Sequence, residues 1–112
     1  MYIGVDVHKD THTAVGISPF GEKLFELTIG NYQKDFDALS TRIRKVESES
    51  LLSPYIGLED CRGYGERIAS ALYAHGYPMV HVPPILVDQA RKRQTHPEKN
   101  DSLDALGVAK VM

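Results

Sequence analysis

The chain opens with a short apolar run at residues 2–7 (Tyr-Ile-Gly-Val-Asp-Val) that is rich in β-branched side chains. The run alternates with the period of a strand, and both of its faces are apolar or small, which is typical of a strand in the middle of a sheet. One carboxylate, Asp6, stands near its end. A buried ionised carboxylate is costly unless it is compensated, and a metal ion is a common compensation. We therefore expect Asp6 to be the first ligand of a metal site.

Length and composition indicate one globular domain. The 112 residues, 42% of them hydrophobic and 25% charged, suffice for a single core. The lone cysteine, Cys61, excludes an internal disulfide and gives no sign of an oxidising compartment. We expect a cytoplasmic protein without a signal peptide or membrane span, because no apolar run approaches the roughly 20 residues that a span needs. The net charge of −2 differs from that of a free-standing DNA-binding domain, whereas a domain that holds divalent cations can be acidic.

Turn signals divide the first part of the chain into three strands. We expect these strands at residues 2–7, 11–18 and 22–29, and a Ser-Pro-Phe-Gly turn at 18–21 separates the last two. Because the connections are short, the three strands are predicted to form an antiparallel meander.

Helical periodicity begins after this meander. Asn31 is the predicted N-cap, and a polar loop is predicted at 47–53. The apolar positions at helical spacing are Phe36, Leu39, Ile43 and Val46. Charged residues surround them, which predicts an amphipathic helix that packs on the sheet and exposes its charged face.

A strand, a helix and a strand follow. The strands are predicted at 54–59 and 77–82, and the helix between them opens at 63–65 and is capped by Gly76. The apolar stripe of this helix consists of Tyr64, Ile68 and Leu72. Such an order predicts a parallel, right-handed crossover.

Two more helices are predicted, at 85–93 and from Asp101 onward, with a polar loop at 94–100 between them. The last one shows no stop signal, so we expect residues 1–112 to be a fragment of a longer protein. By analogy, the whole element order is that of an RNase H-like α/β fold, in which helices flank a mixed five-stranded sheet and the first and fourth strands are neighbours.

Four carboxylates converge in such a fold. Asp6 and Glu59 would end neighbouring strands, where α/β sheets place their sites. Asp101 and Asp104 are three residues apart and would share one helix face. Oxygen ligands of this kind suit Mg²⁺ or Mn²⁺. Two such ions, about 4 Å apart, activate an attacking oxygen and stabilise a leaving oxygen on phosphorus.

Each acid also has a plainer explanation. Asp6 fits a turn or an edge strand, and Glu59, which Asp60 follows, fits a solvated strand end. Asp101 and Asp104 fit a helix-capping pattern. The combination of the acids, and their order along the chain, favours the metal site.

Three blocks of the sequence together resemble the DEDD transposases of insertion sequences, which are recombinases guided by a bridge RNA. They are Gly-Val-Asp-Val-His-Lys-Asp-Thr-His at 4–12, Gly-Leu-Glu-Asp at 57–60 running into Gly-Tyr-Gly at 63–65, and Lys-Asn-Asp-Ser-Leu-Asp-Ala at 99–105 with Val-Ala-Lys at 108–110. The resemblance covers essentially the whole chain and identifies it with the family's N-terminal, RuvC-like domain.

The resemblance implies a DNA strand-exchange enzyme. Asp6, Glu59, Asp101 and Asp104 match the four acids that bind Mg²⁺ in this family. The family's C-terminal domain supplies a serine that attacks DNA, and that domain is not in this chain. The implied partners are DNA, the bridge RNA and further copies of the protein in an oligomer.

Other polar residues have competing explanations. Candidate phosphate contacts are Arg91, Lys92, Arg93 and Lys99, together with His96. A solvated helix end explains the same residues. His8 and His12 flank the first turn, where a metal role is open to them, and Tyr64 would either stack on a base or pack in the core.

Three alternative functions are also compatible with the sequence. The first is a structure-selective nuclease of the Holliday-junction-resolvase type, which needs no serine. The second is the nucleotide-binding half of an actin-like or sugar kinase, in which a glycine usually stands two residues after the first Asp; His8 occupies that position here. The third is a non-catalytic assembly domain.

Overall fold

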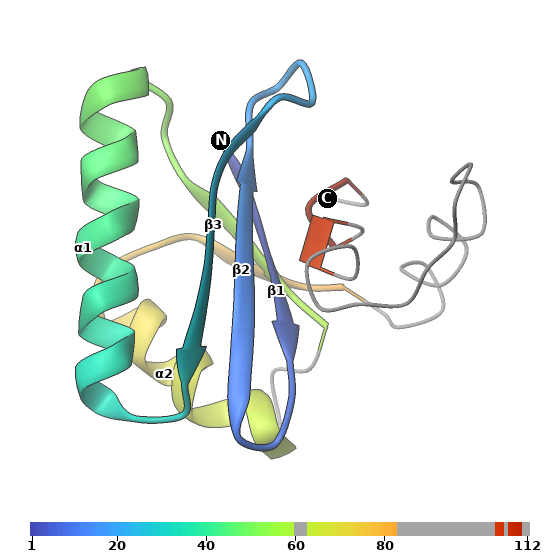
Figure 1. Cartoon of the computed structure of the whole chain (residues 1–112), viewed down its shortest axis with the longest axis vertical. Helices are drawn as coiled ribbons and strands as arrows, with labels where there is room; N and C mark the ends of the chain where they lie inside the picture. The colour runs from blue at the N-terminus through green and yellow to red at the C-terminus, as the bar shows by residue number, and fades with distance from the viewer. Residues whose placement is uncertain (60–62, 83–104, 107, 111–112) are drawn as a thin grey trace.

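The structure is a computed structural model that describes residues 1–59, 63–82, 105–106 and 108–110. It contains a five-stranded sheet of order β3-β2-β1-β4-β5. The strands are β1 (Tyr2–Val7), β2 (Thr11–Ile17), β3 (Lys23–Gly30), β4 (Tyr55–Leu58) and β5 (Met79–His81). The helices are α1 (Gln33–Ser50) and α2 (Glu66–Ala74), and the 3₁₀ turn η1 (Gly63–Gly65) leads into α2. Figure 1 shows both helices on one side of the sheet. The predicted mixed sheet flanked by helices is confirmed.

Strand pairing follows the predicted topology. β1 pairs with β2 and β2 with β3 in antiparallel orientation, which is the meander. β1 also pairs with β4 in parallel, from Tyr2 opposite Tyr55 to Val5 opposite Leu58. β4 and β5 are parallel, joined by the crossover through α2. The first and fourth strands are therefore neighbours, as predicted.

The main core lies between the sheet and the two helices. Ile3 and Val5 of β1 are fully buried there, since apolar side chains from α1 and α2 cover them. The buried helical residues are Phe36, Leu39, Ile43, Val46, Ile68 and Leu72. These include all four apolar residues predicted for the first helix, because their spacing keeps them on one face of α1.

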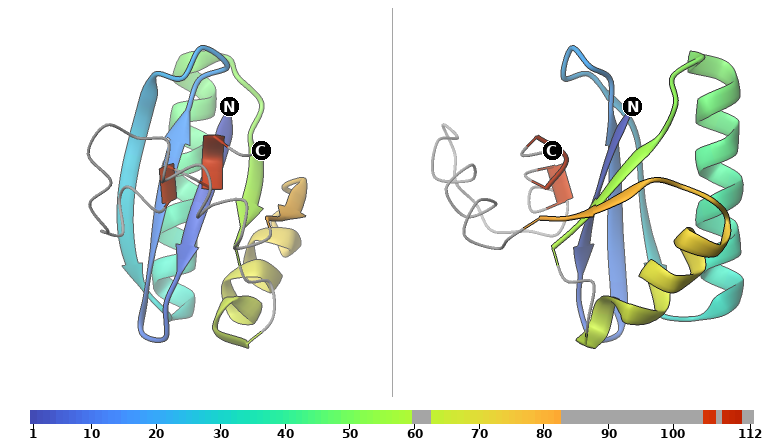
Figure 2. Two further views of the ribbon diagram at one scale, coloured as in Figure 1. Left: turned by 90° about the vertical axis from the view of Figure 1, so that its right-hand side faces the viewer. Right: turned by 180° about the vertical axis from the view of Figure 1, so that it is seen from behind.

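A helical segment covers the opposite face of the sheet. Residues 105–106 and 108–110, hereafter the last helical segment, are helical. Its Ala105 and Ala109 pack on Val15 and Ile17 of β2. Val108 packs beside Val82. Figure 2 shows this segment on the side of the sheet away from α1. The central strand β1 is consequently covered on both faces, as its composition predicts.

The boundaries of α1 differ from the prediction. The N-cap is Tyr32 rather than Asn31, and no side chain bonds to the cap. The Asn31 side chain instead accepts a hydrogen bond from His12 at 3.1 Å. The helix also continues through the first four residues of the predicted loop to Ser50, whose hydroxyl bonds to the Val46 carbonyl at 2.7 Å.

The start of α2 also differs from the prediction. Ile68 and Leu72 are fully buried, but the side chain of Tyr64 is 55% exposed. Tyr64 belongs to η1, whose tighter 3₁₀ winding turns it away from the face that Ile68 defines. Gly76 has φ +85° and ends the helical region as predicted. The helix predicted at 85–93 lies outside the described residues, and within the described ones no helix is long and apolar enough to cross a membrane.

The C-terminal end of α1 provides a test of backbone strain. Leu51 has a left-handed conformation (φ 60°, ψ 25°), its side chain is 89% exposed, and its N–H donates to the Glu47 carbonyl at 2.9 Å. Because glycine adopts this conformation without a steric penalty, Leu51→Gly should raise the free energy of unfolding by about 0.5–1 kcal/mol in urea titrations. Leu51→Ala keeps the Cβ atom and should show no such gain. Equal gains in both variants would assign the effect to the loss of an exposed leucine.

Candidate metal centre

Asp6 lies on the sheet face opposite α1 and α2. In a strand, successive side chains alternate, so Ile3 and Val5 enter the main core while Gly4 and Asp6 face the last helical segment. Asp6 is only 3% exposed. A carboxylate buried to this degree needs compensating donors or cations.

His8 supplies one such compensation. Its Nε2 donates to Oδ2 of Asp6 at 2.7 Å, and the exposed fractions of the two side chains are 44% and 4% respectively. The turn that carries His8 is fixed by its backbone N–H, which donates to the Thr11 carbonyl at 3.1 Å. Hydrogen bonds to an ionised group are stronger than neutral ones, so this contact both stabilises the buried charge and orients the carboxylate.

Glu59 directly follows β4, beside Asp6. The last paired residues of the two parallel strands are Val5 and Leu58, and Asp6 and Glu59 are the next residues on each strand. Neighbouring strands are about 4.8 Å apart, and alternation places both carboxylates on the same face. Glu59 is half-buried. The structure therefore brings the first two predicted acids to adjacent strand ends.

The other predicted site residues lie outside the described part of the chain. These are Asp101, Asp104, Arg91, Lys92, Arg93 and Lys99, and Cys61 and His96 are also outside it. Asp104 immediately precedes Ala105, the first described residue of the last helical segment. Among the described residues alone, no three metal-ligating side chains form a group.

A row of polar residues continues from Asp6 across the sheet, and sequence reasoning did not find it. Thr13 of β2 stands opposite Asp6, and Thr28 of β3 stands opposite Thr13. The two threonine Oγ1 atoms are hydrogen bonded at 2.9 Å. The row therefore makes this sheet face polar at the end where Asp6 lies, whereas Val15 and Ile17 keep it apolar farther along β2. Strand register, rather than any motif, determines this row, so the sequence carries no direct signal for it.

The contact between His8 and Asp6 also went unpredicted, although its signal is present. Residues two apart in an extended chain share a face, so this spacing places the two side chains side by side. His12, by contrast, is fully buried on the opposite face, and its ring centroid lies 6.4 Å from that of Phe36. The structure thus separates two histidines that the sequence analysis had considered together.

His12 is a core histidine. Its Nε2 donates to Oδ1 of Asn31, and its Nδ1 is buried with no hydrogen-bond partner among the residues that the structure describes. Burial lowers the pKa of His12 from its usual value of 6.5; the bond to Asn31 opposes this shift and the nearby His8 adds to it. His12 is therefore neutral in the folded protein near pH 7.

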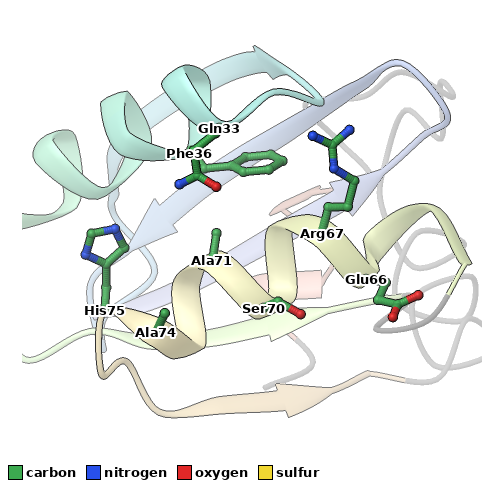
Figure 3. Close-up of a pocket in the computed structure, with 8 residues that line it drawn as sticks. All are labelled: Gln33, Phe36, Glu66, Arg67, Ser70, Ala71, Ala74 and His75. Atoms are coloured by element: carbon green, nitrogen blue, oxygen red, sulfur yellow. The ribbon is translucent and has the colours of Figure 1, made fainter.

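A groove of about 450 Å³ lies in the other layer, between α1 and α2 (Figure 3). Its lining residues are Gln33, Phe36, Glu66, Arg67, Ser70, Ala71, Ala74 and His75. The sheet separates these residues from Asp6, so the groove and the candidate metal centre are distinct features.

Lowering the pH should destabilise the protein through His12. Its folded pKa lies below the unfolded value, so its contribution to stability is complete above pH 6.5 and is lost as the pH falls through 6.5 toward the folded pKa. His12→Gln, which cannot titrate, should show a shallower fall in the free energy of unfolding. The difference should reach at most about 1.4 kcal/mol per pH unit in urea titrations between about pH 7.5 and about pH 5.5. Parallel curves would contradict this assignment.

Removing the His8 side chain should destabilise the fold. His8→Ala takes a donor from the buried Asp6 carboxylate and should lower the free energy of unfolding by about 1–2 kcal/mol. His8→Gln places an amide nitrogen near the same position and should retain most of the stability. In the Asp6→Asn background, His8→Ala should cost much less. Equal costs in both backgrounds would show that His8 acts independently of Asp6.

Two comparisons with known proteins bear on this arrangement. A family model described as a transposase, for DEDD transposases of the IS110 type, matches residues 3–112. A solved structure, T. thermophilus RuvC in complex with a Holliday junction substrate, is similar: the TM-score is 0.62 at 13% identity, and the alignment covers 97% of this chain and 89% of that chain. At this identity the likeness shows the fold, which is the RuvC-like, RNase H-like fold expected from the element order. No match was found among curated proteins.

Proposed function

This chain belongs to the DEDD transposase family of the IS110 type, and we propose that residues 1–112 form the metal-binding catalytic domain of such a transposase. The chain is a transposase domain with a RuvC-like fold. In this proposal it is the N-terminal domain of a longer cytoplasmic enzyme, and it contributes to cleavage and exchange of DNA strands. The resolvase-type, nucleotide-binding and non-catalytic alternatives are not favoured by the comparisons.

The observation that carries the proposal is the placement of Asp6. This carboxylate is 3% exposed and ends the central strand, next to Glu59 on the neighbouring strand. The segment that follows Asp104 packs on the same face of the same strand, at Gly4. In our proposal Asp101 and Asp104 complete a four-carboxylate centre at this point.

The donor set fits a hard divalent cation. Carboxylate oxygens suit Mg²⁺ and Mn²⁺, and a cation would offset the cost of the buried Asp6 charge. Bound Mg²⁺ or Mn²⁺ supplies Lewis-acid stabilisation of the charge that develops on a scissile phosphate. His8 holds Asp6 in one orientation, so this ligand is preorganised before the cation arrives.

The remaining parts of the reaction fall to basic residues of this chain and to partners. We assign DNA or RNA phosphate contacts to Arg91, Lys92, Arg93 and Lys99, which precede the last two acids in the sequence. A serine in a C-terminal domain would attack the DNA, a bridge RNA would select it, and an oligomer would hold the two DNA sites. Family membership supports the roles proposed for the serine, the bridge RNA and the oligomer, and positive charge supports the phosphate contacts.

Mn²⁺ binding tests the proposed centre. In calorimetric titrations, Asp6→Asn and Asp104→Asn should each lower the affinity for Mn²⁺ at least about tenfold, because each removes a charged oxygen ligand. Asp10→Asn is the matched control. Asp10 is exposed in the turn after β1, and its substitution changes the net charge equally. An equal loss in all three variants would indicate diffuse charge attraction and would contradict a centre built on Asp6.

A further inference from the structure

Gly4 is the point where the last helical segment meets the sheet. A Cβ atom added at Gly4 would lie 2.2 Å from the carbonyl oxygen of Ala105, 2.4 Å from the backbone nitrogen of Ala109 and 3.0 Å from its Cα. Real Cβ atoms essentially never come closer than 3.0 Å to another heavy atom. The backbone of the helix therefore rests directly on the backbone of β1, with no room for a side chain between them.

The contact is rigid because backbone atoms form it in both elements, β1 and the last helical segment. A clash with the end of a flexible side chain is relieved by rotation, but a carbonyl or amide moves only if the helix moves. Ala105 and Ala109 are one helical turn apart and both are buried. Their side chains also pack on Val15 and Ile17 of β2, so the segment cannot slide sideways without losing those contacts.

Gly4 and the first acid of the proposed centre share one rigid strand. Asp6 lies two residues after Gly4 on the same face, which is a separation of about 6.6 Å along a strand. On the facing side, Asp104 directly precedes Ala105, whose carbonyl oxygen contacts Gly4. One backbone contact thus joins the strand that carries Asp6 to the segment that follows Asp104.

From this geometry we propose that Gly4 is a positioning residue for the metal centre. The absence of its side chain sets how closely the last helical segment lies on β1, and this distance sets the separation between Asp6 and the acids that precede the segment. The inference rests on the proposed function, because it takes Asp6 and Asp104 as ligands of one centre.

The expected displacement of the helical segment is large compared with the tolerance of a metal site. Ordinary van der Waals contact begins at 3.4 Å, so a Cβ atom at Gly4 would push the segment back by about 1 Å. Metal–ligand distances tolerate only about 0.2 Å. Gly4→Ala should therefore impair the centre even though it removes no ligand.

The first experiment compares two glycines of the sheet. Gly4→Ala should lower the Mn²⁺ affinity measured by calorimetry about 10- to 100-fold. Gly16→Ala is the matched control in β2, because its Cβ atom would lie 2.3 Å from the ring of Phe25, a buried β3 side chain on the opposite face of the sheet. Gly16→Ala should lower stability toward urea but leave Mn²⁺ affinity within about twofold of the original chain. Loss of affinity in proportion to loss of stability in both variants would overturn the proposal.

A double-mutant cycle separates positioning from a general structural role. If Gly4 acts through Asp104, Gly4→Ala should cost little further affinity in the Asp104→Asn background. Additive losses would overturn the proposal. If Asp6→Asn leaves Mn²⁺ binding intact, the proposed function itself fails, whereas intact binding in Gly4→Ala alone refutes only the positioning role.

A measurement without metal covers the case in which Gly4→Ala is poorly folded or the isolated chain binds weakly. Amide hydrogen exchange of residues 105–110 should accelerate in Gly4→Ala while exchange in β1 and β2 stays slow. Ala109→Leu enlarges a side chain of the helical segment that is 2% exposed, so it should also push the segment away from β1. Amide exchange of residues 105–110 should accelerate in this variant too. Unchanged exchange in both variants would overturn the proposal.

Discussion

The structure depends on the burial of β1 on both faces. Ile3 and Val5 are completely covered by the α1–α2 layer, while Gly4 and Asp6 face the last helical segment. β1 also has a neighbour on each side, antiparallel β2 and parallel β4. Because all of its sides are occupied, each position on this strand is constrained by packing or pairing. The strand can therefore hold a polar group in a fixed place far more rigidly than a loop could.

That rigidity explains how a carboxylate is tolerated in the interior. Asp6 is at the end of the strand, where the neighbouring turn brings His8 back to it at 2.7 Å. The carboxylate is thus held beside the partly exposed imidazole of His8, at the end of a buried strand. His12, only a few residues away, is buried in the opposite layer and is held neutral by burial. Two histidines near one turn consequently have opposite roles: one stabilises a charge, and the other avoids carrying one.

The periodicity of apolar residues predicted most of the fold, because the burial of apolar side chains determines both their spacing in the sequence and the packing of the elements. The alternation of residues 2–7 and the helical spacing from Phe36 to Val46 required particular faces to be covered, and the structure covers them. Boundaries were less predictable, since they depend on single contacts. The Asn31 side chain bonds to His12 instead of capping α1, and Tyr64 falls in a 3₁₀ turn that breaks the helical stripe. The adjacency of Asp6 and Glu59 followed from the strand order, but the contact of Gly4 with Ala105 depends on where one helix lies, which no local pattern encodes.

The parallel pairing of β1 with β4 also makes part of this fold non-local in sequence. The β1–β2–β3 meander is local, whereas Tyr2 meets Tyr55 only after a loop of roughly fifty residues has closed. Non-local contacts of this kind slow the folding reaction. During synthesis, β1 emerges long before its parallel partner, so Asp6 has no neighbouring Glu59 until the chain has grown past β4. The order of synthesis thereby keeps the two acids apart until β4 has been made.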